Sequence, residues 1–275
     1  MDEATREEIV VADAVEADAW ADMYGAAPAP MGLVTEEIAG ARLLVAPRIP
    51  ISMLNRVIGL GLSEDATAVT IDRVLARLRA IGAQSPWIHV SPAARPATLV
   101  DALVERGYAP TARPTWAKVL RGREEPPEIA TSLEVRDVGR DRAAELAAVL
   151  VAAHGMPPPV APWIEALVGR PGWRAFAAVD AGRVVSGAFL FQRGDRAWLG
   201  MGGTLPSHRN RGAQGALMVR RIREAIAAGA RHIVTETGEP VAGEPNPSLS
   251  NMYRCGFRKV ASRMNYAPSA AVGAG

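Results

Sequence analysis

A segment rich in arginine and glycine, residues 205–217, has the residue types of an anion-binding site. It follows a predicted strand and leads into a helix whose apolar face includes Leu217 and Ile222. Small residues let backbone N–H groups converge on an oxyanion, and a helix N-terminus adds about half a positive charge. Arg209 and Arg211 add fork-shaped donors. Phosphate or pyrophosphate is the favoured ligand, although an ordinary turn with solvated arginines has the same pattern.

The elements around this segment are predicted by apolar periodicity and by helix-ending residues. The helix that it opens ends at Gly229, and a strand follows at residues 232–236. Asn246 then provides an N-cap with proline at the first helical position. This short helix runs to Cys255, and Gly256 opens the last strands.

The first half of the chain repeats this order. A helix whose apolar face includes Ile71 and Leu78 ends at Gly82. A strand at residues 87–91, a helix at 97–106 and a strand pair ending near 116–120 follow. The repeat predicts a duplicated fold, and the alternation of strands and helices indicates the α/β or α+β class.

Charge, a Pro-Pro pair and few apolar residues mark residues 121–131 as an exposed connection. We therefore predict domains at 1–125 and 131–267, followed by a disordered tail at 268–275. Residues 1–30 predict a loosely attached leading helix and a loop, to which we assign no chemistry.

The composition argues against several classes of protein. The net charge is +2, from 31 basic and 29 acidic residues, which is no excess of the kind that holds a non-specific nucleic-acid binder to its partner. One cysteine and four scattered histidines predict neither disulfides nor a metal site. No apolar run approaches the roughly 18 residues of a membrane span. We expect a cytoplasmic protein, monomer or homodimer, that binds no metal, nucleic acid or membrane.

The pattern P-x-x-R-x-x-G-A-Q at residues 206–214 resembles the acyl-CoA pyrophosphate loop of the GNAT (Gcn5-related) N-acetyltransferases, R/Q-x-x-G-x-G/A. Asn246, Tyr253 and the later Gly256-Phe257 resemble the family's fourth helix and the G-F that follows it. The resemblance covers residues 133–266. It implies an α+β (mixed α/β) fold with two GNAT-like domains, each a mixed, mainly antiparallel twisted sheet flanked by helices.

In that family the fourth strand parts from the fifth, and the gap holds the pantetheine arm of the cofactor. The corresponding residues 197–205 contain three glycines, which suit a bulge. Acetyl-CoA, or another acyl-CoA, is the implied co-substrate. The implied site comprises Gly203, Thr204 and Leu205 beside the pantetheine, Arg209, Asn210, Arg211, Gly212, Ala213, Gln214, Gly215 and Ala216 around the pyrophosphate, and Asn246 and Asn251 of the fourth helix.

The sequence departs from the family pattern in two places. Gln214 stands where the loop usually ends in glycine, which crowds the loop but leaves its backbone amides in place. The fourth strand lacks the glutamate that many relatives use as a general base. Glu236 on the next strand is the best substitute by position, because a carboxylate beside the gap can take a proton from an amine. A solvated strand-end glutamate is the alternative.

Many relatives place a tyrosine on the fourth helix, where its hydroxyl protonates the departing thiolate. Counting forward from Asn246 gives Tyr253, whereas counting back from Gly256 gives Met252. Successive helical residues differ by about 100° of rotation, so only one of the two can face the sulfur. We name Tyr253 as the candidate general acid.

The first half has Glu64 and Asp65 where the phosphate loop should be, and these would repel a pyrophosphate. We interpret it as a degenerate copy that either shapes the acceptor pocket or stabilises the active half.

The leading hypothesis is an N-acyltransferase that moves an acetyl or other short acyl group from acyl-CoA to a small-molecule amine in a ternary complex. The alternative is a non-catalytic acyl-CoA-binding protein.

Overall fold

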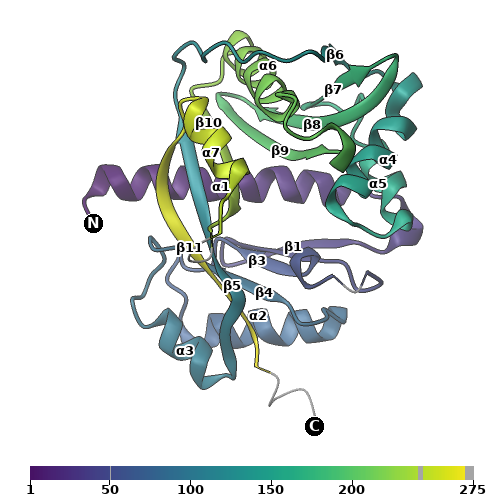
Figure 1. Cartoon of the computed structure of the whole chain (residues 1–275). Helices are drawn as coiled ribbons and strands as arrows, with labels where there is room; N and C mark the ends of the chain where they lie inside the picture. Colours follow the sequence, from purple (N-terminus) through teal and green to yellow (C-terminus); the bar gives the residue numbers. More distant parts are fainter. Residues whose placement is uncertain (50, 241–243, 270–275) are drawn as a thin grey trace.

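A computed structural model of the chain describes residues 1–49, 51–240 and 244–269. Within these residues, eleven strands form one continuous sheet in the order β1-β2-β3-β4-β11-β5-β10-β9-β8-β7-β6 (Figure 1). Neighbouring strands are antiparallel except for β3 with β4 and β9 with β10. The mixed, mainly antiparallel α+β fold is therefore confirmed. Among the described helices, none is long and apolar enough to cross a membrane.

The strands of the first half are β1 Val34–Ile38, β2 Ala41–Val45, β3 Arg56–Ile58, β4 Trp87–Val90 and β5 Tyr108–Arg121. Those of the second half are β6 Glu134–Asp137, β7 Trp173–Asp180, β8 Arg183–Arg193, β9 Arg196–Thr204, β10 His232–Gly238 and β11 Arg258–Pro268. The helices are α1 Glu3–Gly25, α2 Ala68–Ile81, α3 Leu99–Glu105, α4 Ala143–His154, α5 Ala161–Glu165, α6 Ala213–Ala227 and α7 Pro247–Arg254.

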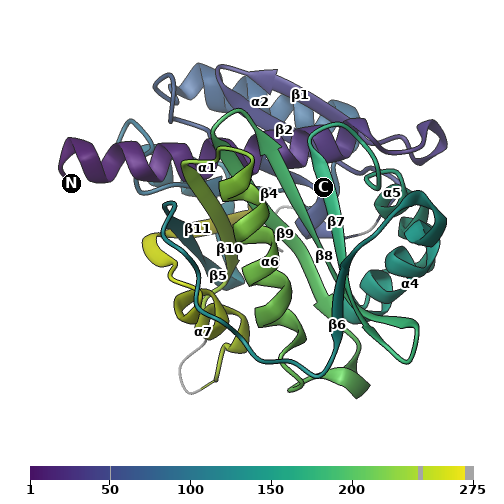
Figure 2. The same cartoon turned by 90° about the horizontal axis from the view of Figure 1, so that it is seen from above.

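Helices cover both faces of the sheet, because successive strand residues point to opposite sides. On β7, Ala175 and Ala177 pack in one apolar core with α1, α4 and α5, whereas Phe176 and Ala178 pack in another with α6 and α7. Figure 2 shows α6 against the strands of the second half, with α4 and α5 at the far side. Helices α2 and α3 cover the first half in a third core.

The two halves exchange their last strands. Strand β5 ends the first half, yet it pairs with β10 on one side and β11 on the other, both from the second half. Strand β11 ends the second half and lies between β4 and β5 of the first. The middle of the sheet is thus built jointly, and the division into domains at 1–125 and 131–267 stays a prediction.

Helix α1 corrects the expectation of a loosely attached leading segment. It runs across the middle of the molecule, between the strands of the two halves (Figure 1). Its inner side buries Ala12, Val15, Ala19 and Met23 together with the charged Glu16. Two of its acidic residues, Asp13 and Glu16, are therefore paired inside the protein.

Most of the other predicted elements are confirmed, including helices α2, α6 and α7, strands β4 and β10, and the Asn246 cap. The strand pairs expected at the end of each half are wrong, because a single long strand, β5 or β11, stands in each place. The end of the predicted disordered tail, residues 270–275, lies outside the described residues.

Candidate functional site

The sheet opens between β9 and β10. These parallel strands pair only where Arg196, Ala197 and Trp198 face residues 232–234. Beyond that point β9 continues to Thr204 and β10 to Gly238, but no further residues of the two strands pair in the described part of the chain. The pairing leaves a gap with free strand edges at the position that the sequence predicts.

The glycines of β9 form the expected bulge. Gly203 pairs with Gly187 and Gly200 with Phe189, so β9 carries one extra residue over this interval. Met201 within it adopts a left-handed φ of 53°. Arg221 of α6 donates Nη1 to the carbonyls of Phe189 (3.1 Å) and Gly200 (3.3 Å), which satisfies acceptors that the bulge takes out of the ladder.

The loop before α6 has a geometry suited to an anion. Gly212 is the N-cap of α6, and it has no side chain with which to accept the first-turn amides. These amides are therefore available to a ligand. Gly212 has a φ of 79°, and a Cβ there would lie 2.3 Å from the carbonyl oxygen of Ala130. Only glycine fits at this position.

A cavity of about 960 Å³ lies over the loop and the end of β9. It is lined by nine of the predicted cofactor residues, namely Gly203, Thr204, Arg209, Asn210, Gly212, Ala213, Gln214, Gly215 and Asn251. The structure thus brings the loop, the strand edge and α7 together around one volume.

A second cavity of about 320 Å³ lies on the other side of the gap. It shares His154, Gly202, Gln214 and Ser248 with the first, so the two volumes meet where β9 ends and α6 begins. Its walls come from both halves of the chain and include the carboxylate-bearing Glu236. Two adjoining cavities across a parted sheet can hold two substrates end to end.

Part of the chain that forms this site matches a known protein family. Residues 117–239, from within β5 to just past β10, match the family model described as an acetyltransferase (GNAT) domain. This segment of the chain is thus similar to a GNAT acetyltransferase domain. The match supports acyl transfer from acyl-CoA in general. A search of curated proteins gave no match.

Solved structures share the GNAT fold over most of the chain. A GCN5-related N-acetyltransferase from Kribbella flavida superposes with a TM-score of 0.66 at 16% identity, over 95% of this chain and 97% of that one. One from Sphaerobacter thermophilus gives 0.58 at 15% identity, over 82% and 79%. A tandem GNAT protein from the clavulanic acid biosynthesis pathway gives 0.57 at 16% identity, over 82% and 77%. At these identities the likeness is one of fold.

Four predicted cofactor residues do not line the first cavity, namely Leu205, Arg211, Ala216 and Asn246. Arg211 instead forms an ion pair with Asp180 at 2.5 Å. Asn246 accepts the Leu249 amide and caps α7. The Leu205 amide donates to a carbonyl on the neighbouring strand β8, and Ala216 is buried in the first turns of α6. The contacts given for these groups lie within the protein, and their cofactor roles stay predictions.

Gln214, the departure from the GNAT loop pattern, joins α6 to α7. Its Nε2 donates to Ser248 Oγ at 3.2 Å, and its Oε1 accepts from Asn251 Nδ2 at 2.9 Å. The sequence predicted only that the Gln214 side chain would crowd the loop. In the structure this side chain holds α7 beside the loop.

Several lining residues of the first cavity were missed from the sequence. Ile129 and Ala130 come from the predicted connection, which folds back over the GNAT loop, and His154 comes from the end of α4. Ser250 and Arg254 face the cavity from α7. No local pattern marks these positions, because each is placed by long-range packing.

Glu236 sits on the wall of the second cavity with its side chain 5% exposed. Trp198 Nε1 lies 3.1 Å from both of its carboxylate oxygens, and Lys118 Nζ lies 3.3 Å from one of them. Burial raises the pKa of Glu236, and the nearby Glu16 carboxylate raises it further, against the opposing charge of Lys118. A carboxylate with a raised pKa is a better proton acceptor near neutral pH.

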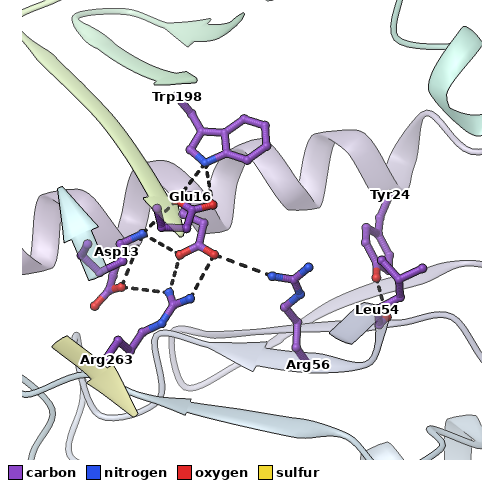
Figure 3. Close-up of polar contacts among 9 residues, drawn as sticks. Asp13, Glu16, Tyr24, Leu54, Arg56, Trp198 and Arg263 are labelled. Carbon is purple, nitrogen blue, oxygen red and sulfur yellow. Dashed lines mark hydrogen bonds and ion pairs between the residues drawn. The ribbon is translucent and has the colours of Figure 1, made fainter. Parts of the chain in front are cut away.

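Behind Glu236 lies a buried charge network, shown in Figure 3. Glu16 of α1 accepts from Lys118 Nζ at 2.6 Å and from Arg263 Nη2 at 3.1 Å, and Arg56 Nη1 lies 3.7 Å away. Burial opposes the ionisation of Glu16, but Arg263 and Lys118 outweigh it and hold its pKa well below the usual value. Helix α1, to which the sequence assigned no chemistry, thus supports the wall of the site.

Tyr253 does not lie in either cavity. It is 45% exposed on the outer side of α7, whereas Met252 is 4% exposed and lines the second cavity. The Asn246 cap fixes where α7 begins and hence its rotation. Tyr253 is therefore not placed to protonate a thiolate in either cavity, and its role as a general acid stays a prediction.

Proposed function

We propose that this protein is an N-acyltransferase that moves an acetyl or other short acyl group from acyl-CoA directly to a small-molecule amine. The observation that carries the proposal is the meeting of the two cavities at the parted end of β9. One cavity has the uncapped N-terminus of α6, suited to a pyrophosphate, and the other has the Glu236 carboxylate, suited to an amine.

The first cavity would hold the cofactor. The amides of residues 213–215 and the Arg209 guanidinium would bind the pyrophosphate, and the β9 edge at Gly203 and Thr204 would pair with the pantetheine amides. The thioester then reaches the junction of the cavities. A backbone amide of the bulged strand is suited to the oxyanion that forms there.

The second cavity would hold the acceptor, and Glu236 would act as general base. The carboxylate takes one proton from the ammonium, and the neutral amine attacks the thioester carbonyl. The new C–N bond forms, the C–S bond breaks, and the remaining proton on nitrogen reaches the thiolate. Free CoA, the amide and one proton released through Glu236 are the products, and no acyl-enzyme forms.

Only the second half would bind CoA. The helix of the first half that corresponds to α6 is α2, and its N-terminus is capped by Thr67, whose hydroxyl accepts the Thr70 amide at 3.2 Å. Asp65, just before it, pairs with Arg95 at 3.3 Å. A capped helix end beside acidic residues has no place for a pyrophosphate. This contrast supports the interpretation of the first half as a copy without CoA.

The test combines binding and turnover. Acetyl-CoA binding is measured by calorimetry, and thiol release is measured with a panel of amines. We expect Glu236→Gln to bind acetyl-CoA normally and to lose about 10²- to 10⁴-fold in kcat, the usual range for a general base. Glu239→Gln, which removes a carboxylate that contacts Lys259 and Ser262 outside both cavities, is the control. Acetyl-CoA binding with no acceptor-dependent thiol release would instead indicate a non-catalytic binding protein.

A further inference from the structure

The walls of the second cavity are made of aromatic and thioether side chains. Four indoles line it, those of Trp20, Trp116, Trp163 and Trp198, together with six methionines, those of Met23, Met53, Met156, Met201, Met218 and Met252. Such surfaces bind apolar groups through dispersion and the release of water. Methionine side chains also adapt to irregular shapes.

Two of the four indole N–H groups on these walls are engaged within the protein, whereas Trp20 Nε1 is buried without a partner among the described residues. Trp163 Nε1 donates to the Met23 carbonyl at 2.6 Å, and Trp198 Nε1 donates to Glu236. Tyr24 OH donates to the Leu54 carbonyl, which fastens the segment beside Met53 to α1. The indoles of Trp163 and Trp198 therefore have no free N–H to offer a polar substrate.

Glu236 is the single acidic side chain on these walls within the described residues. The other strongly charged lining group, Arg221, already donates to the carbonyls of Leu217, Phe189 and Gly200. A ligand with one ammonium group can therefore pair with the Glu236 carboxylate. A second ammonium would be desolvated without a counter-charge, which is costly.

The first half of the chain supplies part of this surface. Trp20 and Met23 come from α1, Met53 and Leu54 from the segment before β3, and Trp116 from the exchanged strand β5. Without these residues the cavity would be open on one side. The first half of the chain therefore forms part of the wall of the second cavity.

We propose that the acceptor is a compact, apolar monoamine, an alkylamine or arylalkylamine, whose body packs against the tryptophans and methionines contributed by both halves while its nitrogen faces Glu236. This rests on the proposed function. It specifies the acceptor class and gives the first half the role of forming the acceptor wall.

The first arm of the test compares amines of equal length. Hexylamine and phenethylamine are measured against the straight-chain diamine with the same six carbons, with acetyl-CoA as donor. We expect kcat/KM for hexylamine to exceed that for the diamine by at least about 100-fold, because the second charge loses its hydration. Equal rates, or a preference for the diamine, would overturn the inference while leaving N-acyl transfer intact.

The second arm tests the first-half wall. Met53→Ala and Trp116→Ala should raise KM for phenethylamine by about tenfold or more through lost apolar contact, with the Kd of acetyl-CoA unchanged. Val69→Ala, at an exposed first-half position outside the cavity, is the control. Urea unfolding midpoints show whether each variant is folded. If one of the two wall variants is unfolded, the KM of the other decides the test.

Three results separate the possible failures. An unchanged KM for the amine in both folded wall variants contradicts the inference. A change in the KM of long-chain acyl-CoA, with none for the amine, shows that the cavity takes the acyl chain instead and also contradicts it. Acetyl-CoA binding without turnover of any amine contradicts the proposed function itself.

Discussion

Lys118 and Glu236 stand directly opposite each other on the antiparallel strands β5 and β10, and Lys118 Nζ lies 3.3 Å from Glu236 Oε2. One residue comes from each half of the chain. The same ammonium lies 2.6 Å from Glu16 Oε2 of α1. The candidate base is therefore held by a cation from the half that lacks the phosphate loop.

This pairing predicts a change in the pH profile. The Lys118 charge opposes the rise in the pKa of Glu236, so its removal in Lys118→Gln should raise that pKa further. Because the base must be ionised to act, the acidic limb of kcat/KM should move to higher pH. Lys118→Arg keeps the charge and should keep the limb near its original position. The exposed Lys259→Gln is the control, and an unmoved limb in Lys118→Gln contradicts the role of the pair.

The same substitution should also lower stability. Breaking a buried ion pair by removing one partner typically costs about 3–5 kcal/mol, since the remaining charge is left uncompensated. Glu16 and Glu236 both lose a partner in Lys118→Gln. Urea unfolding at neutral pH measures the loss, and a value within about 0.5 kcal/mol of the wild type, as for an ordinary surface substitution, would show that the network contributes little.

Gly212 should be irreplaceable for CoA binding. In Gly212→Ala the new methyl group meets the Ala130 carbonyl, so the loop must shift away from the α6 N-terminus. We expect acetyl-CoA affinity to fall at least about tenfold, which corresponds to about 1.4 kcal/mol. Gly182→Ala has a similar φ of 81° but nothing within 4 Å of the added carbon, so it isolates backbone strain from the clash. Equal affinities in the two variants would contradict the proposed pyrophosphate site.

The two loop arginines should differ in their effect on cofactor binding. Arg209 lines the first cavity, whereas Arg211 pairs with Asp180. Arg209→Ala should weaken acetyl-CoA binding by about tenfold to 100-fold and reduce its salt dependence, because a charge-assisted contact contributes about 1.5–3 kcal/mol. Arg211→Ala should change affinity by less than about threefold. Calorimetry at two salt concentrations measures both, and a reversed order would place the pyrophosphate elsewhere.

Tyr253 should be dispensable. Its hydroxyl is on the exposed side of α7, so Tyr253→Phe is expected to retain kcat within about twofold, which is about 0.4 kcal/mol in the barrier. Met252→Ala, which opens the wall of the second cavity, should raise KM for the amine. A large loss of kcat in Tyr253→Phe would restore the tyrosine as the general acid.

His89 should make stability depend on pH. It is buried on β4 with no partner for either ring nitrogen among the described residues. Burial, with the charges of Arg263 and Arg56, holds its pKa well below 6.5. The unfolded chain therefore binds a proton that the folded chain does not, and stability falls as the pH drops below about 6.5, by up to about 1.4 kcal/mol per pH unit. His89→Phe should flatten this slope between pH 6.5 and 5, as measured by urea unfolding.

The glycine-rich loop before α6 and the gap could be predicted because their determinants are contiguous. The glycines of β9, the loop at residues 206–214 and the Asn246 cap each act on their own backbone. Local rules of this kind are visible in a single sequence. The rotation of α7 was the exception, since one residue of difference decides whether Tyr253 or Met252 faces the cavity.

The burial of α1 could not be predicted, because it depends on partners far along the chain. Asp13 and Glu16 lie in a segment to which the sequence assigned no chemistry, yet Arg263 and Lys118 meet them across more than one hundred residues of sequence. The apolar periodicity of the sequence also does not predict the order of the strands in the sheet. Nothing in the alternation of residues in β5 shows that both of its neighbours lie in the other half.

The exchange of β5 and β11 has a consequence for how the chain can be made and cut. Strand β5 is synthesised early, but its hydrogen-bonding partners emerge only with residues 232–268, so the first half cannot complete its fold during synthesis. Pairing over such separations closes slowly. A chain severed at residues 122–133 would yield two fragments, each carrying a strand that belongs to the other's sheet. Each half therefore depends on the other to complete the middle of the sheet.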